Sequence, residues 1–151
     1  MENQSLGPQG EPTFARAYET LLAEWSQGNR DREVALHIAF LAWYLMLEPS
    51  HLTGLNEASP DARDLARVFG EAHDALAPST SADPELLFVF GLMAQLSPWL
   101  LGETATWEAL SVRYRQTYRE LLPNGIAPEV FANRGAYGEY FDGQARVKGG
   151  Y

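Results

Sequence analysis

The chain has 151 residues, of which 46% are hydrophobic and 12% aromatic, and its formal net charge is −9. This length and composition are typical of one globular domain and exclude a disordered or fibrous protein. The negative charge argues against nucleic acid as a general partner, because non-specific binding to the phosphate backbone depends on Lys and Arg. The absence of cysteine excludes disulfides, thiol catalysis and cysteine-bound zinc, and it favours a cytoplasmic location.

The polar segment 1–12 has no basic start followed by an apolar core, so we interpret it as an N-terminal tail rather than a secretory signal. A first helix is expected over 13–27, where apolar residues recur with the 3.6-residue period of a helix. Gly28 and Asn29 should end this helix. Its expected buried face consists of Phe14, Ala17, Tyr18, Leu21, Leu22 and Trp25.

The second helix is expected after Asp31, whose carboxylate can cap it, and it carries the almost wholly apolar run 34–47. It must end before Pro49, because a proline pushes the preceding residue out of helical geometry. A hydroxyl, a proline and an acid at 59–61 together predict the start of a third helix. This helix should bury one stripe, formed by Leu65, Val68, Phe69, Ala72 and Leu76.

In segment 17–49, a tryptophan and a glycine lie in or near the first helix, three alanines lie in the second, and Glu-Pro ends it: Trp25, Gly28, Ala35, Ala39, Ala42 and Glu48-Pro49. In these residues the segment resembles one tetratricopeptide unit. Its internal spacing differs from that family's repeat of about 34 residues, and no second copy follows. The resemblance therefore implies a helical hairpin and no particular function.

The same kind of start signal recurs at 83–85, before the second apolar run, 86–101. Within this run Pro98 should end or kink the helix. A fifth helix is expected over 104–122, and the Pro-Asn-Gly turn at 123–125 closes it. The residues of this helix that should point inward are Trp107, Leu110, Tyr114, Tyr118 and Leu121.

A short helical turn is expected over 128–133. The last stretch, 134–151, contains five glycines and several aromatic residues, including Tyr137, Tyr140 and Phe141, and we expect it to be irregular. Its aromatic side chains either anchor in pockets of a partner or fold back over the domain's own core.

These elements predict an all-α fold, with one compact domain of about five helices over 13–133 between irregular tails at 1–12 and 134–151. No period-two alternation persists long enough to indicate a strand. Because 34–47 and 86–96 are apolar on all sides, we expect these two helices in the centre and the striped helices around them. Both runs are shorter than the about 20 apolar residues that cross a bilayer, so no membrane span is expected.

Histidines beside acids form the first candidate site. The spacing Glu-x-x-His is half of a di-iron carboxylate signature, which makes these residues candidate metal or ligand contacts. The alternative is that the histidines are hydrogen-bonded core or loop residues, and no cofactor is expected. The candidate pairs are Glu33 with His37, Glu48 with His51, and His73 with Asp74.

A basic and aromatic patch forms the second candidate site. Arg115 and Arg119 are one helical turn apart, and Arg113, Tyr114 and Tyr118 lie beside them in the sequence. Such a patch could bind a phosphate, a carboxylate or an acidic peptide, because Arg offers a fork of donors and Tyr a stacking face. The alternative is that the arginines pair with nearby acids while the tyrosines fill the core.

The sequence contains no motif for serine catalysis and no phosphate-binding loop. We therefore expect a non-enzymatic interaction module, such as an accessory subunit, adaptor, chaperone or inhibitor, that docks on another protein or self-assembles. The alternative is a small helical metal- or ligand-binding protein or enzyme with a pocket of histidines and acids between helices. The candidate partner contacts are Arg115, Arg119, Tyr137, Tyr140 and Phe141.

Overall fold

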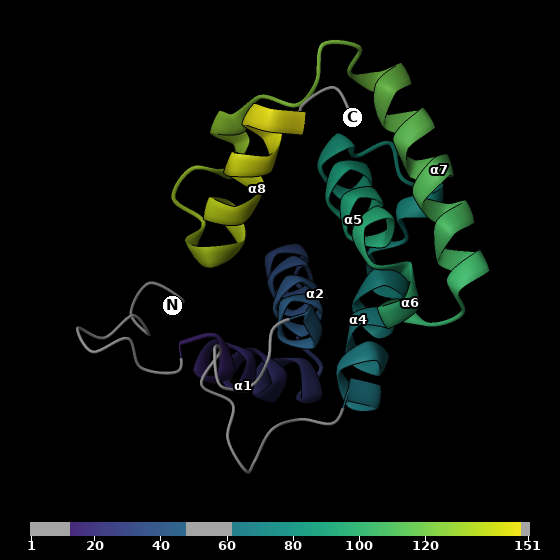
Figure 1. Ribbon diagram of the computed structural model, residues 1–151. Helices are drawn as coiled ribbons and strands as arrows, with labels where there is room; N and C mark the ends of the chain where they lie inside the picture. Colours follow the sequence, from purple (N-terminus) through teal and green to yellow (C-terminus); the bar gives the residue numbers. More distant parts are fainter. Residues whose placement is uncertain (1–12, 48–61, 149–151) are drawn as a thin grey trace. The chain divides into compact units, whose positions relative to one another are not determined.

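The computed structural model describes residues 13–47 and 62–148 (Figure 1). All regular structure in these residues is helical, which confirms the all-α prediction, although there are seven α-helices rather than about five. The described helices include none that is both long enough and apolar enough to cross a bilayer. The chain divides into two compact units, one ending at Ala75 and one beginning at Leu76. The predicted single domain over 13–133 stays a prediction.

The first unit contains the helices α1 (Thr13–Ser26), α2 (Arg32–Leu47) and α4 (Ala62–Leu76). The helices α1 and α2 form the expected hairpin, and they run antiparallel: the ring of Phe14, near the start of α1, lies 4.8 Å from that of Tyr44, near the end of α2. Helix α2 is buried along most of its length, as its apolar sequence predicts, whereas α4 buries one stripe.

The end of α1 follows the predicted signal. Gly28 has a φ of +99°, a left-handed conformation that glycine adopts without steric cost. The next residue, Asn29, donates its backbone N–H to the carbonyl of Glu24 at 3.0 Å, which satisfies one of the free carbonyls at the helix end. The backbone carbonyl of Asp31 then accepts from the N–H of Ala35 at 2.9 Å as α2 begins.

A polar contact joins α1 to α4 within the first unit. The indole Nε1 of Trp25 donates to Oε1 of Glu71 at 3.0 Å, and Arg67 donates to the other carboxylate oxygen at 2.9 Å. The guanidinium of Arg30 lies 3.7 Å from the centre of the Trp25 ring. The hydrogen bond from Trp25, together with Arg67, lowers the pKa of Glu71.

The second unit is built around α5, which is buried from Glu85 to Ala94. Asp83 caps this helix as predicted, since its carboxylate accepts the N–H of Glu85 at 3.0 Å. The backbone leaves helical geometry at Ser97, and Pro98 begins a separate short helix that the sequence did not predict. In chain order the elements are η2 (Pro78–Thr80), α5 (Pro84–Leu96), α6 (Pro98–Leu101), α7 (Thr104–Leu121), η3 (Pro128–Phe131) and α8 (Gly135–Lys148).

The inner face of α7 differs from the prediction at its end. Trp107, Tyr114 and Tyr118 are buried as expected, but Leu121 is 40% exposed, so its predicted burial is wrong. The chain that follows the helix instead folds back to Tyr118, because the N–H of Ile126 donates a hydrogen bond to the Tyr118 hydroxyl at 2.7 Å. Ile126, rather than Leu121, is therefore the buried apolar residue at this end.

The prediction that 134–151 is irregular is wrong for Gly135–Lys148, which form α8. Each glycine in a helix interior costs about 1 kcal/mol relative to alanine, and this cost motivated the prediction. Tertiary packing offsets it, because Tyr137 and Phe141 are one turn apart and both are fully buried. Gly138 is required at its position: a Cβ there would lie 2.3 Å from the carbonyl oxygen of Phe131.

A buried carboxylate fixes the start of α8 to the start of α5. Glu85 is only 6% exposed, and its Oε2 accepts a hydrogen bond from the hydroxyl of Tyr137 at 2.5 Å. The same oxygen lies 2.8 Å from a guanidinium nitrogen of Arg134. The guanidinium also lies over the Tyr137 ring, 5.1 Å from its centre. A buried charge is tolerated here because it is paired and hydrogen-bonded.

The buried Glu85–Arg134 pair should contribute measurably to stability. We expect Glu85→Ala to lower the free energy of unfolding in urea by about 3 kcal/mol, because it leaves a guanidinium and a buried hydroxyl without their acceptor. In a double-mutant cycle with Arg134→Ala, the two losses should fall short of additivity by at least about 1 kcal/mol. Strictly additive losses would contradict the coupling.

Two glycines of α8 should respond to alanine in opposite directions. Gly138→Ala should lower the free energy of unfolding by about 2 kcal/mol or more, because the new methyl group meets the Phe131 carbonyl. Gly143→Ala should raise it by about 0.5 to 1 kcal/mol, since no atom lies within 4 Å of the new Cβ and alanine favours the helix. Urea denaturation of both variants is the test, and destabilisation by Gly143→Ala would argue against α8.

Candidate functional site

The candidate site lies on α7, whose two faces differ in composition. The inner face contacts α5 and carries buried residues at a spacing of three or four, which includes Ser111, Tyr114 and Tyr118. The hydroxyl of Tyr114 lies 2.9 Å from that of Ser79, and burial raises the pKa of Tyr118. Both tyrosines therefore fill the core, as one sequence-based alternative proposed, and neither offers a stacking face to a ligand.

The outer face of α7 lines an open pocket of about 430 Å³. Its described lining residues follow the pattern i, i+3, i+4, i+7 and i+8, so they lie along one side of the helix over about two turns. The sequence pattern indicated the two arginines but not the other three described residues, although their helical spacing from Arg115 and Arg119 was a usable signal. Among the residues that the structure describes, the lining consists of Val112, Arg115, Gln116, Arg119 and Glu120.

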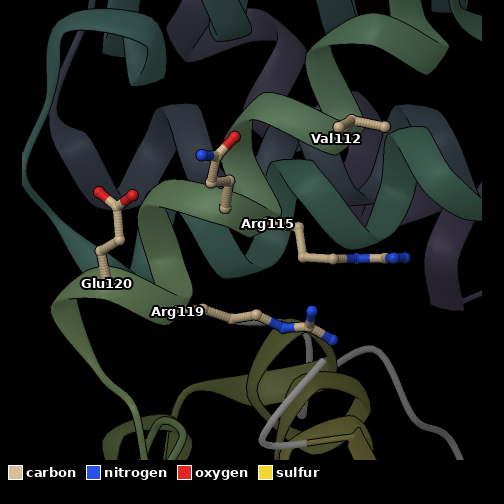
Figure 2. Close-up of a pocket in the computed structure, with 5 residues that line it drawn as sticks. Val112, Arg115, Arg119 and Glu120 are labelled. Carbon is tan, nitrogen blue, oxygen red and sulfur yellow. The ribbon is translucent and has the colours of Figure 1, made fainter.

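The charges of the pocket are separated in space. Figure 2 shows the side chains of Arg115 and Arg119 extending from α7 toward the same side, while the carboxylate of Glu120 extends away from them. Arg119 is exposed and Arg115 is half-buried, whereas Val112, one turn before Arg115, is 62% exposed. The pocket thus combines two guanidinium groups with an apolar side chain.

Arg113 provides an internal comparison for the two pocket arginines. It lies on the same helix and its side chain is exposed, but it is not one of the described residues that line the pocket. A substitution at Arg113 removes one positive charge from α7 without removing a pocket residue.

Two of the described C-terminal aromatic residues lie in the core of the second unit. Tyr137 and Phe141 are fully buried, and their rings are 5.1 Å apart. Phe141 also packs against Phe88 of α5, with ring centres 6.3 Å apart, and Tyr140 is half-buried at 5.0 Å from Phe141. Of the two alternatives for this segment, folding back over its own core describes Tyr137 and Phe141.

The structure keeps the histidine and acid candidates as separate pairs. Nε2 of His37 lies 3.3 Å from the carboxylate of Glu33 on α2, and Nδ1 of His73 lies 3.1 Å from that of Asp74 on α4. The third pair, Glu48 with His51, lies outside the described residues. Within 13–47 and 62–148, no group of three or more His, Asp or Glu could hold a metal ion. The His73–Asp74 pair is a hydrogen bond, which fits the alternative of a hydrogen-bonded helix residue, whereas the His37–Glu33 pair is a contact at ion-pair distance.

His73 is the more informative of the two described histidines, because it is buried in the stripe of α4. Desolvation lowers the pKa of its imidazole, and the hydrogen bond with Asp74 opposes this shift only in part. The buried ring therefore favours the neutral form.

The pKa shift of His73 predicts a pH dependence of stability. With a folded-state pKa below the unfolded value of about 6.5, the unfolded chain takes up the proton first as the pH falls. The free energy of unfolding should therefore decrease as the pH falls below about 6.5 and level off for this group below its folded-state pKa. Urea denaturation of the wild type and His73→Gln at several pH values is the test. If the free energy of unfolding of His73→Gln decreased equally with falling pH, groups other than His73 would be responsible for the pH dependence.

Comparisons of the chain with models of protein families, with curated proteins and with solved structures found no match. A functional conclusion therefore depends on the residues of the chain itself. Among the described residues, the outer face of α7 combines a pocket, exposed charge and exposed apolar surface.

Proposed function

We propose that this protein is a non-enzymatic interaction module that docks on another protein through the outer face of α7. The observation that carries the proposal is the open pocket of about 430 Å³, in which Arg115 and Arg119 lie beside the 62% exposed Val112. Arginine is among the residue types that are enriched at protein interfaces and at the positions that contribute most to their binding energy.

The charge balance of the chain supports a specific rather than a general role for these arginines. The protein carries a net charge of −9, so a pair of arginines on one helix face is a local exception. A guanidinium presents a planar fork of donors, which recognises a carboxylate with defined geometry. Such a pair favours a protein partner with a matching acidic group over non-specific attraction to nucleic acid.

The alternative of a metal- or ligand-binding protein depends on the histidine and acid pairs. In the described part of the chain, the pairs of His37 and His73 each consist of one imidazole and one carboxylate on the same helix. Neither pair includes a third ligand there, so no observation on these residues favours this alternative.

Site-specific photo-cross-linking tests the proposed docking face. A diazirine amino acid in place of Gln116, inside the pocket, should cross-link to a defined protein in the cells that make this chain. The same amino acid in place of Glu108, an exposed position on α7 that does not line the pocket, should not cross-link to that protein.

The arginines supply the matched variants for this experiment. Combining Arg115→Ala and Arg119→Ala should remove the cross-link from position 116, whereas Arg113→Ala should retain it. Circular dichroism should show that the double variant remains helical, since Arg119 is exposed and Arg115 is half-buried. An absence of cross-links at position 116, or equal cross-links at both positions, would contradict docking through this face.

A further inference from the structure

The turn after α7 contains the one Asn-Gly step of the sequence, Asn124-Gly125. We propose that Asn124 is a site of spontaneous deamidation, and that the isoaspartate formed there loosens the attachment of the following chain to Tyr118. This modification is independent of the docking face proposed above, and water is its only co-reactant.

The position of Asn124 in the fold favours this reaction. An asparagine deamidates when the backbone nitrogen of the next residue attacks its side-chain amide, so a small next residue outside regular secondary structure favours the attack. Asn124 is exposed and lies between α7 and η3. Gly125 has no Cβ to hinder the approach, and its φ of +85° is a conformation that favours glycine at this position.

A hydrogen bond holds the attacking nitrogen in the native turn. The N–H of Gly125 donates to the carbonyl of Leu122 at 2.9 Å, which closes a turn with Pro123 and Asn124 at its two central positions. This bond must break before the nitrogen can lose its proton and reach Cγ of Asn124. Because the turn lies at the surface and outside the helix, local opening is sufficient and α7 stays folded.

The reaction has two steps, and neither is an oxidation or a reduction. In the first step, the bond from the Gly125 nitrogen to Cγ of Asn124 forms and the bond from Cγ to Nδ2 breaks. The side-chain nitrogen leaves as ammonia with the proton of the Gly125 N–H, and a succinimide ring remains. In the second step, water adds to either carbonyl of the ring and opens it to aspartate or isoaspartate, and the ammonia takes up the carboxyl proton.

The modified turn lies between two contacts with Tyr118. The N–H of Leu122 donates to the Tyr118 carbonyl at 2.8 Å, and the N–H of Ile126 donates to the Tyr118 hydroxyl at 2.7 Å. Isoaspartate adds one methylene group to the backbone between these contacts, so the two hydrogen bonds no longer fit together without strain. Either product also adds a negative charge near the C-terminus of α7, where the helix dipole is itself negative.

Asp142-Gly143 provides a comparison within the chain, because an Asp-Gly step forms the same succinimide with loss of water. This step lies inside α8, and Asp142 accepts a hydrogen bond from Nε of Arg146 at 3.0 Å. Helical geometry holds a side chain away from the backbone nitrogen that follows it. We therefore expect isoaspartate at position 124 and none at position 142.

Incubation of the purified protein at mildly alkaline pH for several weeks tests the inference. Peptide mapping by mass spectrometry with electron-transfer fragmentation distinguishes isoaspartate from aspartate. It should show that the Asn124 amide is lost first, while Asn29, Asn133 and Asp142 remain unchanged. An Asn124 amide that persists, one that is lost only after another asparagine has reacted, or isoaspartate at position 142 would overturn the inference.

Stability measurements test the structural consequence. The isoaspartate form, separated chromatographically from the unmodified protein, should have an equilibrium constant for unfolding in urea that is at least about fivefold higher. Asn124→Asp supplies the charge without the extra methylene group, so its equilibrium constant should rise less.

Asn124→Gln is the matched control for the incubation. It retains an amide but must form a larger ring, which closes more slowly, so its mass and its stability should stay constant through the same treatment. Equal stability of the isoaspartate and unmodified forms would contradict the loosened contact with Tyr118. An equal loss of stability in the incubated Asn124→Gln would show that a change elsewhere in the chain is responsible, and it would also overturn the inference.

Discussion

The second unit depends on the ring of Phe88, because this one side chain joins four of its elements. It extends from the buried helix α5 and lies 5.4 Å from Tyr118 of α7, 6.0 Å from Phe131 of η3 and 6.3 Å from Phe141 of α8. Aromatic pairs of this kind contribute about 0.5 to 1.5 kcal/mol each beyond the area they bury. The packing of α7, η3 and α8 therefore has a common origin in one buried face of α5.

This packing also determines which residues of α7 reach solvent. With Tyr114 and Tyr118 held inside, the residues that directly follow them, Arg115 and Arg119, lie about 100° further around the helix, on its flank, where Arg115 is half-buried and Arg119 is exposed. The same rotation exposes Val112 beside them, so the candidate docking face is a consequence of core packing rather than a separate feature. The chemistry of this docking face arises because the sequence places guanidinium groups outside the inner face of α7 that packs in the core.

Polar contacts complement the aromatic packing in both units. In the first, Trp25 of α1 donates to Glu71 of α4, and in the second, Tyr137 of α8 donates to Glu85 of α5. Each bond joins helices that are distant in the sequence and requires a defined position of both side chains. Apolar contacts tolerate a shift along the helix axis more easily than a hydrogen bond does, so we infer that these pairs specify register.

The amino-acid sequence by itself determined the helical class, the two buried helices α2 and α5, and helix ends such as those at Gly28 and Asp83. These features are local: they depend on periodicity, capping and backbone conformation within a few residues. Helix α8, and the side of α7 that reaches solvent, were decided only by tertiary structure. A glycine-rich segment becomes helical when distant aromatic residues bury its rings, and the outer side of α7 is set by what packs against the inner side. Both outcomes depend on contacts between residues far apart in the chain, which local patterns do not encode.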